Sequence, residues 1–139
     1  MKSNLLFSVL ANTYSLQLKT QNYHWNVVGN DFVALHTLFG KQYEEMYESI
    51  DEIAERIRTF GTKVTASFEA FAKVDTIGKA NEQFSGIEMV KDLKDGNDKL
   101  CICIKDAIKV FDDATDDFLR NRLLVHQKNI WVLSSILVK

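Results

Sequence analysis

The sequence predicts an all-α protein that folds as a four-helix bundle with one long crossover connection. The chain has 139 residues, no proline and only six glycines, so most of it lacks the residues that interrupt helices. Three of the six glycines fall within residues 61–86, which marks the long connection. Hydrophobic residues make up 46% of the chain, enough for one packed core, and we expect a single domain over residues 1–139.

The first predicted helix begins near the N-terminus. Ser3 or Asn4 can cap it, because a short polar side chain accepts a hydrogen bond from the first free backbone N–H groups. The helical pattern continues to about Val28, and Gly29 provides the left-handed exit that ends many helices.

The second predicted helix follows at once, with Asn30 or Asp31 as its cap. Its apolar residues recur mostly every three or four positions as far as Ile57, and the helix is expected to stop before Gly61. Gly40 interrupts it at a cost of about 1 kcal/mol relative to alanine, which suggests either close packing at that position or a small local loss of stability.

Residues 61–86 form the predicted crossover, with a short helical piece at Ser67–Ala72. A connection of this length joins parallel helices more easily than adjacent antiparallel ones. From Ile87 onward the pattern is helical to the C-terminus, but one helix of about fifty residues is out of scale for a compact domain. We therefore predict a break within Asp112–Asp117, whose carboxylates can cap the last helix.

Charge and composition exclude several classes of function. A net charge of −2 and a pI near 5.9 give no bulk attraction to nucleic acid, and only Lys2 precedes the first helix, so no DNA binding through a basic tail is expected. The apolar run at the N-terminus is broken by Ser8, which favours a helix over a secretion signal, and no run reaches the roughly 18 residues of a membrane span. Cys101 and Cys103 are poorly spaced for a mutual disulfide, so we expect a cytoplasmic protein.

Four residues stand out as candidate metal ligands: His24, His36, Asp51 and Glu55. Two imidazoles and two carboxylates are a mixed nitrogen and oxygen set of the kind that holds redox-active iron. His24 lies five residues before Gly29 and His36 seven after it, so the two histidines have similar heights on an antiparallel hairpin. Asp51 and Glu55 are four residues apart and share one face of the second helix.

One chain cannot bring all four ligands to one ion. Fifteen residues (51 − 36) separate His36 from Asp51, about 22 Å of helix, whereas metal ligands converge to about 2–2.5 Å from one ion. The same fifteen residues make four turns plus about 60°, so both residues lie on one broad side of the helix. If two copies pair antiparallel about a two-fold axis near Tyr43 and Glu44, His36 of one chain faces Asp51 and Glu55 of the other. The sequence therefore predicts a metal site shared between subunits.

A site inside the bundle of one chain would instead use a Glu-x-x-His motif. That motif is absent, since the residues three positions before the histidines are Gln21, Val33 and Leu123.

The segments NYHWNVVGNDFVALHTLF, DEIAERIRTFG, DDATDD and HQKNIWVL resemble the Dps family of mini-ferritins, and the similarity covers nearly the whole chain. The resemblance implies a ferritin-like bundle with a short helix in the crossover. It implies a ferroxidase centre at a two-fold interface, with His24 and His36 from one subunit and Asp51 and Glu55 from its neighbour. It also implies a hollow homo-dodecamer, built from two-fold dimers, that oxidises ferrous iron with hydrogen peroxide in preference to oxygen. Ferric mineral would be stored inside, which protects against oxidative damage.

The resemblance gives roles to three further residues. Trp25 would shield the centre or quench oxidants, although a core tryptophan is an equal alternative. Asp113 and Asp117 would line the three-fold pore through which iron enters, which is compatible with a role at a helix N-terminus. An outer pore position that is often acidic in the family is Ile108 here.

Other positions depart from the family or receive no role. We expect His126 at the surface and Trp131 in the core, and we expect neither to be a metal ligand. The carboxylates that follow the second histidine in many members are replaced here, which would either weaken mineral nucleation or move it to other acidic residues of the second helix. The replacing residues are Thr37, Gly40 and Lys41, and the alternative nucleation residues are Glu44, Glu48 and Glu52.

Three alternatives remain open from the sequence. His24 could be a hydrogen-bonded structural residue, and Asp51 with Glu55 could form a solvated face paired with Arg56 or Arg58. The protein could be a nucleoid-associated, DNA-protecting structural protein with little ferroxidase activity. It could also be a helical cage with an inactive site that serves surface interactions.

Overall fold

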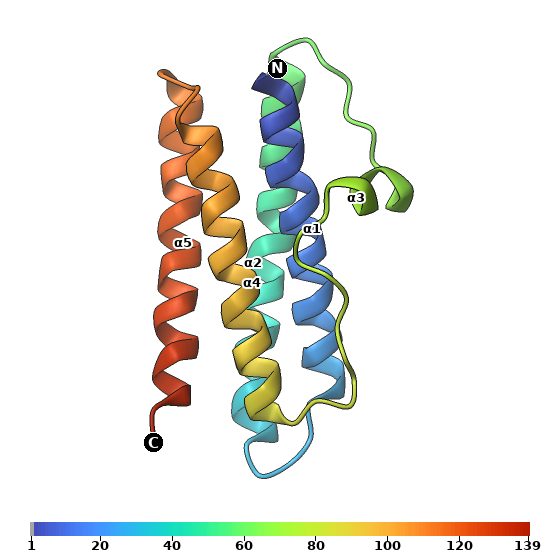
Figure 1. Ribbon diagram of the computed structural model, residues 1–139, viewed down its shortest axis with the longest axis vertical. Coiled ribbons are helices and arrows are strands. Elements are labelled where there is room, and N and C mark those ends of the chain that lie inside the picture. Colours follow the sequence, from blue (N-terminus) through green and yellow to red (C-terminus); the bar gives the residue numbers. More distant parts are fainter. Residues whose placement is uncertain (1) are drawn as a thin grey trace.

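The computed structural model describes residues 2–139 and shows four long helices and one short one (Figure 1). The elements in chain order are α1 (Lys2–Asn26), α2 (Phe32–Thr59), α3 (Phe68–Val74), α4 (Gly86–Ile108) and α5 (Ala114–Leu137). The long helices lie side by side, and the connection from α2 to α4 runs along the bundle with α3 within it, so α2 and α4 point the same way. No strand occurs between residues 2 and 139, and the predicted all-α bundle with a long crossover is confirmed.

The ends of α1 differ from the prediction. Lys2 is already helical, so Ser3 and Asn4 lie inside the first turn and do not cap it. The helix ends at Asn26, two residues before the predicted end at Val28. Gly29 has a φ of 112°, a conformation that side chains other than glycine rarely adopt, so it makes the predicted turn.

Four other helix ends agree with the sequence pattern. Asp31 occupies the N-cap position of α2, although its side chain forms no capping hydrogen bond. The α2 helix ends before Gly61, as predicted. Ser67 caps α3 by accepting a hydrogen bond from the N–H of Ala70, and Asp113 caps α5 by accepting one from Thr115.

The start of α4 is fixed by a capping box that the sequence analysis missed. The Ser85 hydroxyl accepts a hydrogen bond from the Glu88 N–H, and the Glu88 carboxylate accepts one from the Ser85 N–H. The spacing Ser-x-x-Glu before an apolar run is the sequence signal for this motif. These hydrogen bonds lower the pKa of Glu88.

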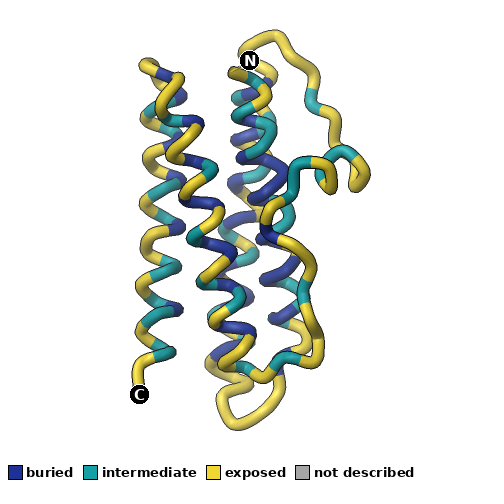
Figure 2. The backbone as a smooth tube through the Cα atoms, in the orientation of Figure 1, coloured by how far each residue is buried: buried dark blue, intermediate teal, exposed yellow. Residues whose placement is uncertain are grey.

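The core lies between the four long helices, and the surface-facing half of each helix is exposed (Figure 2). Its largest fully buried side chains include Tyr23, Phe39, Met46, Ile53 and Leu93. No helix among residues 2–139 combines the length and apolar character needed to cross a membrane.

A polar cluster ties the crossover to α1 and α4. The Tyr23 hydroxyl donates to Asp92 at 2.5 Å and accepts from the N–H of Asn81 at 3.1 Å. The buried ammonium of Lys19 lies 3.1 Å from Asp92 and donates to the carbonyl oxygen of Ile77 at 3.1 Å. Burial, and then the hydrogen bond to Asp92, raise the pKa of Tyr23. The second half of the crossover is therefore held against the bundle by ionic and neutral hydrogen bonds.

A second buried network corrects the prediction for His126 and Trp131. His126 is fully buried, donates from Nδ1 to the side-chain oxygen of Asn97 at 2.9 Å, and accepts from Arg122 at 3.2 Å. Arg122 also holds Glu45 of α2 with two N–H groups. Trp131 is 67% exposed. The expected positions are reversed because residues 115, 119, 122, 126 and 133 form the inner stripe of α5, and position 131 lies outside it.

Both cysteines are free, as predicted. Cys101 is buried, and burial raises its pKa to about 11.

Candidate metal centre

The structure brings His24, near the end of α1, against His36, near the start of α2. The two rings stack with centroids 3.8 Å apart and an angle of 12° between their planes. Nδ1 of His24 lies 2.6 Å from the carbonyl oxygen of His36, and Nδ1 of His36 lies 2.7 Å from that of His24. Because a carbonyl oxygen only accepts hydrogen bonds, each Nδ1 carries the proton. In a neutral imidazole with this proton, Nε2 carries the free lone pair, which is the form that binds a metal.

Neighbouring side chains enclose this histidine pair. A Cβ atom built on Gly40 would lie 3.0 Å from Cε1 and 3.1 Å from Nδ1 of His24, which confirms the predicted close packing at this glycine. The Tyr43 ring centroid lies 5.3 Å from that of His24, and Phe32 stacks on His36 with centroids 4.9 Å apart. Neither aromatic contact was predicted from the sequence. The spacing of four residues between Phe32 and His36 could have indicated the second.

Asp51 and Glu55 lie exposed in the second half of α2, away from the histidines. The helix is continuous from Phe32 to Thr59, so the separation of about 22 Å between His36 and Asp51 is retained. Neither carboxylate forms an ion pair within residues 2–139, and Arg58 instead donates to the carbonyl oxygen of Thr62 at 3.0 Å. The same part of the chain contains no cluster of three or more His, Cys, Asp or Glu side chains that could hold a metal. One chain thus presents two separate pairs of donors.

The surface around both donor pairs is rich in exposed apolar side chains. Trp25 of α1 is 63% exposed and Tyr47 of α2 is 64% exposed, so the alternative of a core tryptophan at position 25 is wrong for the single chain. Beside Asp51 a hollow is lined by Tyr14, Tyr47, Glu48, Ile50, Asp51 and Ala54. Exposed aromatic side chains are enriched at protein interfaces.

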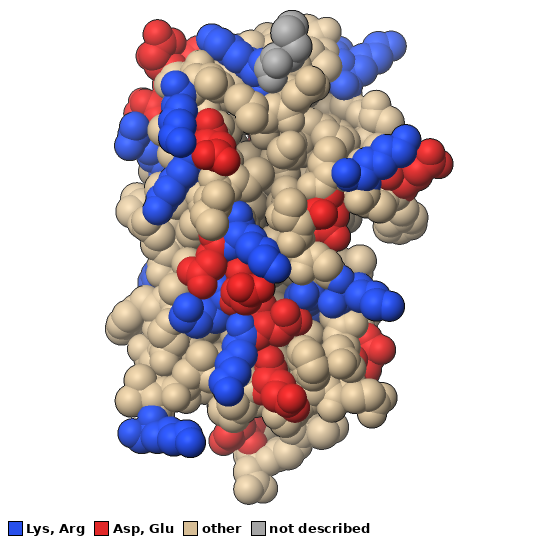
Figure 3. All heavy atoms as spheres, viewed as in Figure 1, with Lys and Arg blue, Asp and Glu red and all other residues tan. Residues whose placement is uncertain are grey.

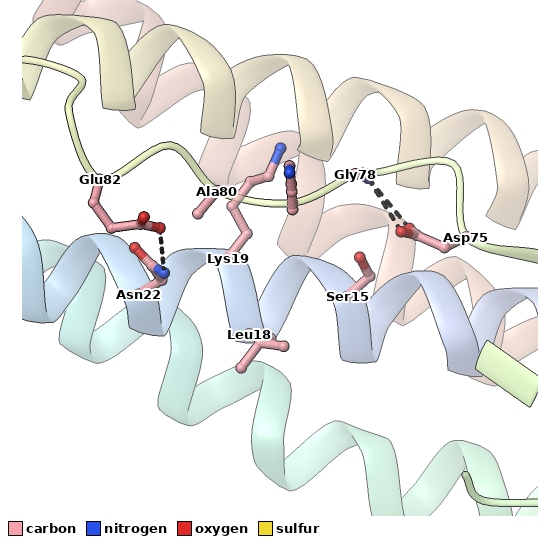
Figure 4. A pocket seen from close by; sticks show the side chains of 9 residues that line it. Ser15, Leu18, Lys19, Asn22, Asp75, Gly78, Ala80 and Glu82 are labelled. Atoms are coloured by element: carbon pink, nitrogen blue, oxygen red, sulfur yellow. Dashed lines mark hydrogen bonds between the residues drawn. The ribbon is translucent and has the colours of Figure 1, made fainter. Parts of the chain in front are cut away.

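A groove between α1 and the crossover offers no comparable donor set (Figure 4). Its charged and amide side chains at Lys19, Asn22, Asp75 and Glu82 all bond to other groups of the chain. The Glu82 carboxylate accepts from Asn22 at 3.0 Å, and Asp75 accepts from the Gly78 N–H at 3.3 Å.

The two candidate pore residues lie at the start of α5. Asp113 is the N-cap residue, and Asp117 is exposed in the first turn of the helix. The carboxylates therefore do serve a helix N-terminus. Ile108, at the end of α4, packs partly against the core.

Comparison with known proteins gives consistent matches over the whole chain. A family model described as a ferritin-like domain matches residues 3–139. The DNA protection during starvation protein of Brevibacillus brevis is 33% identical over 96% of this chain and 92% of its own length. An uncharacterized low temperature-induced protein of Nostoc sp. is 36% identical, over 96% of this chain and 78% of its own length.

Solved structures agree with these matches. A Dps protein from Bacillus brevis is 32% identical, with a TM-score of 0.92 over 99% of this chain and 95% of its own. A Dps protein from Vibrio cholerae, described as a member of a broad superfamily of ferritin-like diiron-carboxylate proteins, is 28% identical, with a TM-score of 0.93 over 99% and 89% of the two chains.

Proposed function

The chain belongs to the Dps family of ferritin-like proteins, and on that basis we propose that it is a cytoplasmic iron-storage and detoxification protein with ferroxidase activity. Ferrous iron is its substrate and ferric mineral its product. The ferroxidase centre is formed between two subunits, by His24 and His36 of one and by Asp51 and Glu55 of the other.

The observation that carries this proposal is the reciprocal bonding of the two histidines. Each Nδ1 is bound by the other residue's carbonyl oxygen, so the two free Nε2 atoms are available as neutral donors. Asp51 and Glu55 complete the set, because imidazole and carboxylate together bind both oxidation states of iron.

Assembly follows from the separation of the donor pairs. An antiparallel pair of α2 helices brings His36 to Asp51 and covers the exposed aromatic surface, which a single chain leaves open to water. Such two-fold dimers would build the hollow homo-dodecamer. Asp113 and Asp117 would line the pore for iron, and the exposed carboxylates of Glu44, Glu48 and Glu52 would nucleate mineral.

The electrons and protons of the proposed reaction balance without a basic side chain from the protein. Two ferrous ions give one electron each to hydrogen peroxide, which takes up two protons and leaves as two molecules of water. Because the electrons are delivered as a pair, hydroxyl radical is not released. Oxygen would replace peroxide as a slower oxidant, and Trp25 would intercept oxidising species that escape.

The test is anaerobic loading with ferrous iron, followed by peroxide or oxygen, with ferric absorbance and native mass as readouts. The wild type is expected to oxidise iron rapidly with peroxide. Asp51→Asn and His36→Ala should both lose the fast phase while the mass of the shell is unchanged. Equal rates in the wild type and Asp51→Asn would show that the centre is assigned wrongly.

Protection of DNA is the second candidate function, and the name of the Brevibacillus brevis relative favours it. The charge distribution does not favour it, because basic and acidic side chains intermingle on the face shown in Figure 3. Along α4 they form the ion pairs Lys94–Asp98 and Lys99–Asp95. Binding to DNA that falls steeply with salt would support this function. If no binding to DNA is detected even at low salt, ferroxidase activity is the only candidate function that remains.

A further inference from the structure

Tyr47 is an exposed aromatic residue that the proposed ferroxidase centre does not yet use. It is 64% exposed and forms no side-chain hydrogen bond within residues 2–139. Tyr47 lies eleven residues after His36, which is three helical turns plus about 20°. The azimuth of Tyr47 therefore falls between those of His36 and Asp51, at the centre of the surface that must meet the second subunit.

The pairing proposed for the centre fixes what Tyr47 meets. If His36 faces Asp51, facing residues of the two α2 helices have numbers that add to 36 + 51 = 87. The residue that faces Tyr47 is then 87 − 47 = 40, which is Gly40. Gly40 is four residues after His36, or one turn plus about 40°, so it lies on the same strip of the helix.

Gly40 is buried, and the His24 ring of the same chain fills the place that its side chain would take. The three atoms nearest to its missing Cβ all belong to the ring of His24, at 3.0, 3.1 and 3.9 Å. An aromatic ring that approaches position 40 from the second subunit therefore meets the His24 imidazole. The hollow beside Asp51 has Tyr47 in its wall and faces residues 33–40 of the partner under the same register.

We propose that Tyr47 of one subunit packs on His24 of the other and acts as a positioning residue of the shared ferroxidase centre. This inference rests on the proposed function and adds a third residue to the carboxylate half of the centre. The contact buries an aromatic ring that is exposed in the single chain, and it holds the His24 ring against His36. A residue that orients a ligand in this way typically changes metal affinity by about 10–100-fold when it is removed.

The first test measures the contact itself. A photoreactive benzoyl-phenylalanine at position 47 should crosslink to a second chain within the segments that contain residue 24 and residues 36–40, identified by mass spectrometry. Crosslinks only to residues outside these segments would overturn the inference, whatever the activity of the protein.

The second test measures the effect of Tyr47 on the binding of Co²⁺, with no oxidant added. Tyr47→Ala should bind Co²⁺ about tenfold more weakly and change its visible spectrum, while Tyr47→Phe, which keeps the ring, restores most of the affinity. Trp131→Ala is the matched control, because it removes an aromatic residue of similar exposure from α5. Wild-type affinity and spectrum in Tyr47→Ala would overturn the inference.

Two further variants separate this inference from the proposed function. If His36→Ala and Asp51→Asn abolish Co²⁺ binding but Tyr47→Ala does not weaken it, only the role of Tyr47 is wrong. If neither His36→Ala nor Asp51→Asn weakens binding, the shared centre is wrong, and the role of Tyr47 is overturned with it.

Discussion

Nδ1 of His24 lies 2.6 Å from the carbonyl oxygen of His36, and Nδ1 of His36 lies 2.7 Å from the carbonyl oxygen of His24. The orientation of each ring is thus set by the main chain of the other helix. Each ring needs the other residue in place, and small shifts between α1 and α2 would move both donor atoms together. The precision of the histidine pair therefore depends on how closely the two helices approach.

Gly40 allows that approach, and we expect Gly40→Ala to impair the centre. Alanine favours the helix by about 1 kcal/mol, but its methyl group would lie 3.0 Å from Cε1 of His24 and displace the ring. Co²⁺ affinity should fall about tenfold, and the fast phase of iron oxidation should slow. Gly96→Ala is the control, because its methyl group meets the flexible end of Leu16 at 2.7 Å. Unchanged Co²⁺ affinity in Gly40→Ala would mean that the close approach of α1 and α2 at Gly40 does not position His24.

Lys19 should matter more for stability than other paired lysines. It is 4% exposed and pairs with Asp92, so Lys19→Met leaves a carboxylate without its cation and should cost about 3–5 kcal/mol. Lys94, paired with Asp98 at the surface, is the control, and Lys94→Met should cost less than about 1 kcal/mol. Urea unfolding at one protein concentration measures both. Equal losses in the free energy of unfolding would show that the buried Lys19–Asp92 pair stabilises the fold no more than a surface pair does.

His126 should make the fold sensitive to acid. Burial, and then the charge of Arg122, lower its pKa to about 3, against about 6.5 when unfolded. Folding thus favours neutral His126, and the stability that this provides is fully present above pH 6.5. It is lost as the pH falls from 6.5 toward 3, because the unfolded chain takes up a proton that the folded chain refuses, with a slope of at most about 1.4 kcal/mol per pH unit.

The measurement is the melting temperature of wild type and His126→Gln between pH 7.5 and pH 4. The variant should be less stable at pH 7.5, because it disturbs the bonds to Asn97 and Arg122. Its stability should fall less between pH 6.5 and pH 4. Parallel curves would exclude His126 as a source of the acid sensitivity.

The two candidate pore residues can be separated by their roles in α5. Asp113 caps the helix, and asparagine is an equally good cap, so Asp113→Asn should preserve stability. Asp117 is exposed, and Asp117→Asn should change charge alone. If both line the pore, each variant should slow the initial uptake of ferrous iron several-fold. Normal uptake, with oxidation at the wild-type rate, would leave Asp113 with the cap as its only role.

The sequence alone determined the class of fold, because the information for helices is local. The absence of proline, the apolar spacing of the second helix and the carboxylates at residues 112–117 predicted the elements to within a few residues. It also showed that Asp51 cannot reach an ion at His36 of the same chain, since helix rise fixes that distance.

Only the tertiary structure decided how side chains meet across helices. One face of α5 turns inward, which places His126 in the core and leaves Trp131 exposed to water. This is the reverse of the sequence-based expectation. The reciprocal hydrogen bonds of His24 and His36, and the room that Gly40 leaves for the His24 ring, depend on the distance between two helix axes. Residue spacing gives the height of a side chain along its helix. Packing gives its neighbours, because they come from another part of the chain.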